Sequence, residues 1–190
     1  MLQSFPLLGA RLSALALVTD PGTLLDAKGL VVQSETVSTS MGALSTEVLG
    51  AVGPVQLFRF QFPAPVRFCG RFNVRVPWTL TTQSPTAASR GTMRASLTIA
   101  GTTVVSALSG APRNLNSANG TLFTELLALA MSTPVLVNAG DVIELRIQAE
   151  ITTISGVGAD VFTPTLRHNP ELTGDQLVME LQGGALVVSQ

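Results

Sequence analysis

Three arginines that share one face of an expected strand are the residues best placed to do chemistry. In the stretch VRFCGRFNVRVPW, apolar residues alternate with Arg67, Arg71 and Arg75 in the two-residue period of a half-buried strand. Like charges on one strand face repel each other unless opposite charge answers them. We therefore expect at least one of these arginines to pair with a carboxylate, within the sandwich or across a subunit boundary.

The uneven charge distribution supplies candidate partners. No acidic residue lies between Val48 and Thr124, where there are seven arginines, whereas eight acidic residues and two arginines follow from Glu125 onward. Ten of the eleven basic residues are arginine, which suits bidentate pairing and interfaces. We expect the basic middle to pair with the acidic C-terminal third, and an anionic ligand is the alternative. The candidate carboxylates for the arginine face are Glu144, Glu150, Asp160, Glu171, Asp175 and Glu180.

Nucleic acid fits this charge pattern less well than a protein partner does. Nucleic-acid-binding domains are usually basic overall and mix lysine with arginine. This chain has a net charge of −1 and a single lysine. We therefore do not expect nucleic acid among its partners.

Other side chains with reactive chemistry are few. Cys69 is the single cysteine, which excludes an intrachain disulfide and favours a small, half-buried filler. His168 could form a metal site with Glu171 and Asp175, but a loop histidine that caps backbone groups before Pro170 is the simpler interpretation. The sequence also lacks the motifs of serine hydrolases, zinc proteases and phosphate-binding loops. We expect no enzymatic activity, no metal and no cofactor.

Trp78 is the only tryptophan, and the sequence has no tyrosine. Both residue types favour sites that need an apolar body with a polar tip, and Trp78 could therefore form the rim of a glycan site. The interpretation we favour is an anchor in the core or in a subunit interface.

The elements that must position these residues read as strands. Alternating apolar residues recur every 8 to 15 residues or so, separated by Gly, Pro and Asn turns. The pattern predicts an all-β fold, an antiparallel jelly-roll β-sandwich with an N-terminal arm. The expected strands include 30–39, 54–63, 66–78, a hairpin over 91–108 with its turn at Ala100–Gly101, two strands around a turn at 138–141, and strands at 176–181 and 183–188. Residues 121–134 fit a short helix or a strand equally well.

The first 29 residues are expected to form the arm, and residues 30–190 the sandwich. The arm is apolar but lacks strand alternation, so we expect a short helix or irregular segment that contacts another chain. Its candidate interface residues are Leu2, Phe5, Leu7 and Leu8. The start resembles a signal peptide, but it has no basic region and Arg11 interrupts its apolar part. We expect it to be kept and the protein to be made in the host cytoplasm.

The overall composition favours assembly. Of the 190 residues, 46% are hydrophobic and only 12% are charged, whereas soluble chains carry about 25% charge. No apolar run approaches the roughly 20 residues of a membrane-spanning helix, so no membrane partner is expected. We expect the chain to hide apolar surface in a homo-oligomer, with a trimer as the favoured state.

Two short stretches resemble known families. The phrase VNAGDVIELRI, residues 137–147, resembles the penultimate strands of jelly-roll modules of the tumour-necrosis-factor and C1q type. The tail TLRHNPELTGDQLVMEL, residues 165–181, resembles a segment of tailed-phage virion proteins that include head decoration proteins. Both resemblances imply a jelly roll that tends to trimerise, and neither implies catalytic residues.

The function expected from these observations is structural. The chain is expected to be a virion protein, as a capsid-surface decoration or cement subunit or a small jelly-roll capsid protein, with copies of itself and other capsid proteins as partners. The alternative is a receptor-binding or glycan-binding module of a virus particle.

Overall fold

The described part of the chain consists of antiparallel strands, and the expected β-sandwich is confirmed. The computed structural model describes residues 3–5, 15–17, 23–26, 30–33, 38–45, 49–50, 52–61, 66–80, 89–154, 161–168, 172 and 174–187. Side chains are described from residue 38 onward, except those of 45, 60, 61, 66–69, 107, 161 and 180–187. No helix occurs among the described residues, so none has the length and hydropathy of a membrane span.

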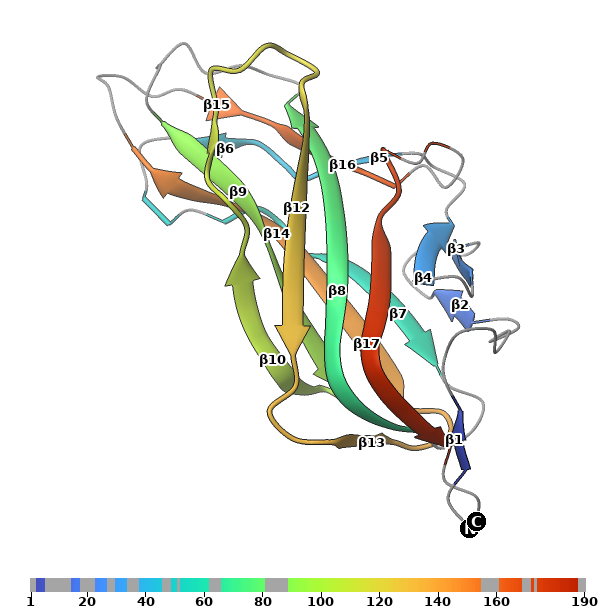
Figure 1. The fold of residues 1–190 in the computed structure, drawn as a ribbon. Helices are drawn as coiled ribbons and strands as arrows, with labels where there is room; N and C mark the ends of the chain where they lie inside the picture. The colour runs from blue at the N-terminus through green and yellow to red at the C-terminus, as the bar shows by residue number, and fades with distance from the viewer. Residues whose placement is uncertain are drawn as a thin grey trace.

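The first sheet is built on a single long strand, β8 (Val66–Leu80). One edge of β8 pairs with β17 (Val178–Val187) and then β16 (Pro164–Arg167), and the other with β13 (Val135–Val137) and then β12 (Leu122–Ala130). Figure 1 shows β12, β8 and β17 side by side. The remaining strands of this sheet are β1 (Gln3–Phe5), β2 (Leu15–Leu17), β3 (Thr23–Asp26), β4 (Leu30–Gln33) and β5 (Ser38–Ser40).

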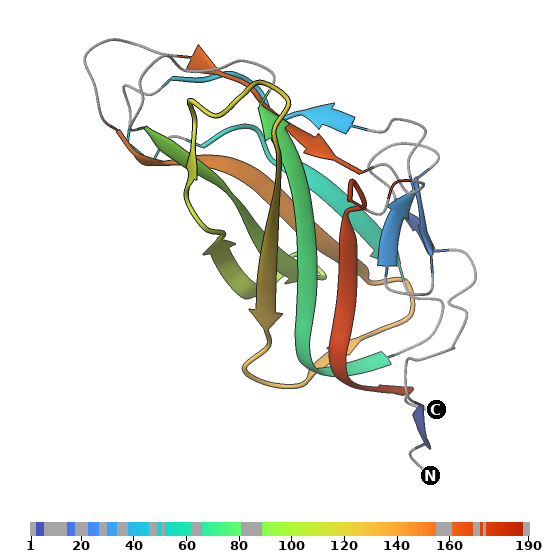
Figure 2. The same ribbon diagram turned by 45° about the horizontal axis from the view of Figure 1, so that its top comes forward.

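The second sheet packs against the first and completes the sandwich (Figure 2). Its strand order is β10 (Thr102–Ser109), β9 (Arg90–Ile99), β14 (Val142–Thr153) and β7 (Gln56–Gln61), with β11 (Arg113–Asn114) on β9. The chain crosses between sheets from β7 to β8, β8 to β9, β11 to β12, β13 to β14 and β14 to β16, as in a jelly roll. A small third sheet joins β6 (Leu44–Ser45) to β15 (Val161–Phe162).

Strict alternation along the strands builds the core between the sheets. On β14 the predicted inward set is buried, and the polar residues between its members are only partly covered. The predicted face of β9 is buried as well. These two sets are Ile143, Leu145, Ile147, Ala149 and Ile151, and Met93, Ala95, Leu97 and Ile99. From β8 the same core receives Phe72, Val74, Val76, Trp78 and Leu80.

Two predicted turns are present. One joins two strands of the same sheet, and the other joins strands of different sheets. The hairpin β9–β10 turns at Ala100 and Gly101, whose φ angles of 48° and 79° suit a two-residue turn with both residues left-handed. The turn at 138–141 is closed by Asp141, whose Oδ2 accepts from the Asn138 backbone N–H at 2.8 Å. The strands around it, β13 and β14, belong to different sheets, so this turn carries the chain across the sandwich.

Three sequence expectations need correction. Residues 122–130 form strand β12, so the helix alternative there is wrong. The strands expected at 176–181 and 183–188 are one strand, β17, which runs through Gly183 and Gly184. The described parts of the arm are short strands, so the expected helix or irregular segment is wrong for them.

The arm joins the sheet of its own chain. On β1, Phe5 lies opposite Ala185 of β17, and β2 and β3 reach β17 through β4. Leu2, Leu7 and Leu8 lie outside the described residues. Contact of the arm with another chain stays a prediction.

Proline inside the central strand β8 has a local explanation. Pro77 lacks an N–H and would break a ladder bond in most central positions. The pairing of β17 with β8 reaches Arg75, and that of β16 begins at Trp78. Pro77 therefore lies where one edge of β8 passes from one neighbour to the next, and no ladder bond is lost.

Candidate assembly interface

The arginine row lies on the outer face of the first sheet. Because Phe72, Val74 and Val76 point into the core, Arg71 and Arg75 point the other way. Arg75 donates from Nε to the backbone oxygen of Gln176 at 3.2 Å and from Nη2 to its Oε1 at 3.1 Å. The side chain of Arg67 lies outside the described residues.

An apolar row runs beside the arginine row on the neighbouring strand. In the register of β12 with β8, Leu126 lies opposite Arg75, Ala128 opposite Asn73 and Ala130 opposite Arg71. Leu126 is 79% exposed, the largest exposed fraction among the large hydrophobic side chains that the structure describes. Directly opposite residues on one face have Cβ atoms about 5 Å apart. The arginines of β8 and the exposed Leu126 of β12 therefore form one continuous surface.

We call this surface the arginine–leucine face: Arg71 and Arg75 of β8 with Leu126, Ala128 and Ala130 of β12. Arginine is enriched at protein interfaces, because its weakly hydrated guanidinium tolerates desolvation. Exposed apolar side chains grouped beside polar ones mark interaction sites. The described acidic side chains are Glu125, Asp141, Glu144, Glu150 and Asp175, and none belongs to this face. The arrangement can bind a partner surface that offers carboxylates beside apolar groups.

The outer face of the second sheet handles its charges differently. Glu144 of β14 binds Arg59 of β7 at 2.6 Å and Arg146 of its own strand at 3.3 Å. Glu150 binds Arg94 of β9 at 3.9 Å. In the two cross-strand pairs the arginine comes from the basic middle and the glutamate from the acidic C-terminal third. The expected pairing between these regions is confirmed within one chain.

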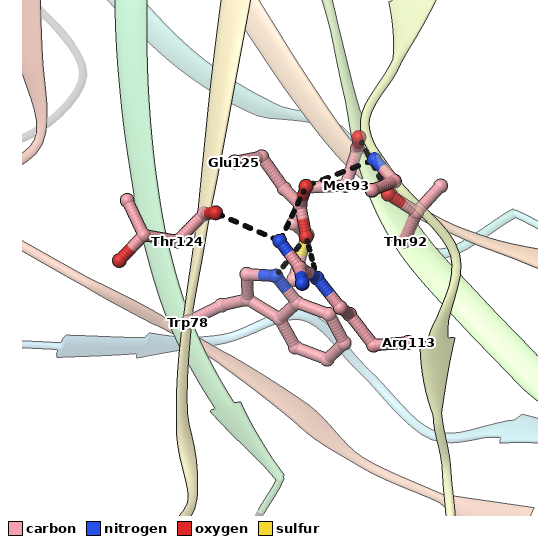
Figure 3. Close-up of polar contacts among 7 residues, drawn as sticks. Trp78, Thr92, Met93, Arg113, Thr124 and Glu125 are labelled. Atoms are coloured by element: carbon pink, nitrogen blue, oxygen red, sulfur yellow. Dashed lines mark hydrogen bonds and ion pairs between the residues drawn. The ribbon is translucent and has the colours of Figure 1, made fainter.

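A third cross-strand pair, with a buried carboxylate, lies where the two sheets meet, beside β12 (Figure 3). Glu125 is 2% exposed and accepts from Arg113 Nε at 2.9 Å and from the Ala111 backbone N–H at 2.9 Å. It also accepts from Trp78 Nε1 at 3.2 Å. Gly110 leaves room for the carboxylate, because a Cβ there would lie 2.5 Å from Glu125 Oε2. The cluster links the first sheet to β11 of the second, because Glu125 accepts from Trp78 of β8 and from Arg113 of β11.

Trp78 belongs to this cluster and not to a surface. It is 1% exposed, and its ring lies 4.7 Å from that of Phe123 between centroids. Its one polar atom already donates to Glu125. The interpretation of Trp78 as a rim of a ligand site is therefore wrong, and the core-anchor interpretation holds.

His168 is likewise part of the interior. It is 2% exposed, its Nε2 lies 2.8 Å from Thr39 Oγ1, and its ring meets Phe58 edge-on. The described hydrogen bond of the ring is with a side-chain hydroxyl, and capping of backbone groups by His168 stays a prediction. Asp175, one of its proposed metal partners, binds Arg167 at 2.7 Å, and Glu171 lies outside the described residues. Among the described residues, no three His, Cys, Asp or Glu side chains are grouped to hold a metal ion.

Sequence reasoning missed the two most informative residues on β12, although a signal was present. Residues 122–130 read LFTELLALA, and as a strand this places Glu125 on the same face as Leu127 and Leu129. A charge on the apolar face and a leucine on the opposite one break the usual pattern. Treating the stretch as a strand would have pointed to both Glu125 and Leu126.

Comparison with known proteins adds little. No family model and no curated protein matches the chain. One solved structure that aligns with it is titled "Structure of infectious bursal disease virus Gx strain", with a TM-score of 0.33 and 11% sequence identity. The alignment covers 94% of this chain and 43% of that chain, so this chain spans less than half of that chain's length. A match at this level establishes neither a family nor a function.

Proposed function

We propose that the chain is a virion structural protein that works by assembly. In this proposal it either decorates and stabilises a capsid surface, as head decoration proteins of tailed phages do, or forms a small jelly-roll shell subunit. Its partners are copies of itself, with a trimer as the expected state, and other capsid proteins. No catalytic step, cofactor or nucleic acid enters the proposal.

The observation that supports this proposal is the arginine–leucine face. Fully burying a leucine side chain contributes about 1.5–3 kcal/mol, and Leu126 leaves most of that gain unused in the isolated chain. A neighbour that covers Leu126 would also desolvate Arg75, whose guanidinium donates to the neutral oxygens of Gln176. A carboxylate on the neighbour would then strengthen the contact and fix its register.

Charge reversal on this face tests the proposal. We expect Arg75→Glu to raise the dissociation constant of the assembly about tenfold, because a carboxylate would then face the neighbour's carboxylate. Arg146→Glu is the matched control, since Arg146 lies on the outer face of the other sheet. Sedimentation equilibrium would measure both, and reversal of the partner carboxylate should restore part of the affinity. A wild-type mass of 19.8 kDa across the micromolar range would contradict assembly.

Imaging of the native particle would test the virion role itself. The chain is expected as density on the capsid exterior for a decoration protein, or within the shell for a capsid subunit. Absence from the particle would overturn the virion role while leaving self-assembly to be judged by sedimentation. The glycan-binding alternative relied on Trp78 as its aromatic residue, and this side chain is buried in the core.

A further inference from the structure

The outer edge of β12 carries main-chain groups that point away from its partner strand. Met131, the residue after β12, donates its N–H to Gly70 of β8 at 3.0 Å, so odd-numbered residues face β8. The carbonyl of Thr124 instead accepts from Arg113 Nη2 at 3.1 Å, so even-numbered residues face outward. Among the described residues, β12 pairs with no strand besides β8.

The two halves of this edge differ. At the first half, Arg113 covers the carbonyl of Thr124, and the buried Glu125 places a charge on the inner side of the strand. Natural sheets use inward-pointing charges and covering segments to block edge pairing. At the second half, Leu126, Ala128 and Ala130 present outward groups with exposed, uncharged side chains. No Lys, Pro or register shift interrupts that half.

The long edge strands of the second sheet carry the protection that β12 lacks. The pairing of β10 with β9 shifts register twice, between Thr103 and Val105 and between Val105 and Leu108. Such irregularities twist an edge away from pairing. At the other edge, β7 carries Arg59. Among the residues described, the second half of β12 is thus a regular, apolar edge with no strand paired to it, and β10 of the second sheet lies nearby.

We propose that a second copy of this chain pairs with the second half of β12, antiparallel and centred on Ala128, so that the first sheet continues across two subunits. In this register Ala128 lies opposite its own copy, and Leu126 lies opposite Ala130 of the other subunit. Each of these hydrogen-bonded residue pairs exchanges two main-chain bonds. The large Leu126 side chain then lies beside the small Ala130 of the partner subunit.

Self-complementarity selects a second copy as the occupant. An isologous contact requires one patch to match itself about a two-fold axis. Residues 126–130 carry no charge, so two copies bring no like charges together on the paired strands. Arg75 lies one strand further back, opposite Leu126, so the two copies of Arg75 are separated by three strand spacings across the sheet and by four residues along it, about 20 Å in all.

The register follows from Arg113. A pairing centred on Leu126 would place the partner against Thr124, where Arg113 already occupies the carbonyl. Centring on Leu127 has the same conflict, because it pairs Ala130 with Thr124, and centring on Leu129 places Leu126 beyond the end of the partner strand. Centring on Ala128 leaves Thr124 outside the paired segment and pairs Leu126, Ala128 and Ala130 with one another. The contact is independent of the proposed virion role, and it adds a two-fold contact to any trimer, as assemblies with both kinds of axis allow.

Disulfide trapping tests the register in a Cys69→Ser background. Opposite residues of a hydrogen-bonded pair have Cα atoms about 5.5 Å apart, within the range of about 4.4–6.8 Å that a disulfide spans. We expect Ala128→Cys to cross-link two chains under mild oxidation. Leu126→Cys and Ala130→Cys should cross-link each other when mixed, and neither should do so alone. Thr153→Cys, exposed at the end of β14, is the control and should not cross-link.

A matched proline pair tests the edge itself. The N–H of Ala128 points outward, so Ala128→Pro removes no bond to β8 and should leave a folded chain whose two-fold association weakens at least tenfold. Leu129→Pro removes an inward bond and should unfold the chain. Ala128→Lys should weaken the two-fold association as Ala128→Pro does, because a charged side chain at an edge opposes strand pairing.

Three results would overturn this inference. Equal cross-linking yields for Ala128→Cys and Thr153→Cys would show that the contact is not centred on the edge. Cross-linking of Leu126→Cys alone would contradict the register. Unchanged association of both folded Ala128 variants, measured by sedimentation velocity, would exclude β12 as the contact. A trimer that persists in these variants would show that the proposed oligomer forms through another surface.

Discussion

The outer faces of the two sheets carry similar residues but treat charge in opposite ways. On the second sheet, Glu144 stands between two arginines of its own chain. On the first sheet, Arg75 meets amide and backbone oxygens of Gln176 and lies beside the exposed Leu126. The glutamates of the second face thus pair with arginines of the same chain, whereas the described contacts of Arg75 on the first face are with neutral oxygens. Composition alone does not distinguish a solvent face from an interface; the neighbours of each charge do.

The largest effect is expected at the border between the two faces, where the pair is buried. Glu125→Ala should lower the free energy of unfolding by about 3 kcal/mol, because it leaves Arg113 and Trp78 Nε1 without their acceptor. We expect the lower end of the buried-pair range, since the Arg113 side chain is 35% exposed. Urea unfolding measures the loss. Glu150→Ala is the control, because the Glu150 side chain is 19% exposed whereas that of Glu125 is 2% exposed, and an equal loss there would contradict the role of carboxylate burial.

A smaller effect, on association rather than folding, is expected on the arginine–leucine face. Leu126→Asp should raise the dissociation constant of the assembly about tenfold, while the monomer's free energy of unfolding changes by less than about 0.5 kcal/mol. Sedimentation and urea unfolding of the same sample separate the two quantities. Ile154→Asp is the control for added charge, because it also replaces an exposed apolar side chain. Equal weakening by both variants would remove the special role of this face.

The smallest effect is expected on the second sheet. Glu144→Gln should cost about 0 to 1 kcal/mol of folding stability, because its arginine partners are 42% and 43% exposed and solvent screens the pairs. The cost should shrink further in about 1 M salt, where screening acts over roughly 3 Å. Association should not change. If Glu144→Gln weakened assembly as strongly as Leu126→Asp, the two faces would not differ in function.

The prediction for the opening arginine row is partly answered. Arg75 is engaged by Gln176 in the chain, through neutral oxygens. The side chains of Arg67 and Glu180 lie outside the described residues, and two other candidate carboxylates, Glu144 and Glu150, bind arginines of the second sheet. In the register of β17 with β8, Glu180 lies opposite Asn73, on the face of Arg71 and Arg75. A carboxylate partner for the row, in this chain or in a neighbouring subunit, therefore stays a prediction.

The sequence by itself determined what is local. The two-residue period chose strands and their buried faces, as on β14, because successive side chains of a strand point to opposite sides. The dipeptide Ala100–Gly101 favours the hairpin, since its left-handed backbone matches the twist of paired strands. The segregation of arginines from acids predicted their pairing, because opposite charges attract wherever the chain brings them together.

Only the tertiary structure decided which strands are neighbours. Several connections cross from one sheet to the other, so sequence order does not give strand order. This crossing put Arg113 of β11 against Glu125 of β12, and it left the second half of β12 as an edge beside the arginines of β8. A strand lies at an edge when no other strand pairs with one of its sides, and the residues of that strand alone do not show this.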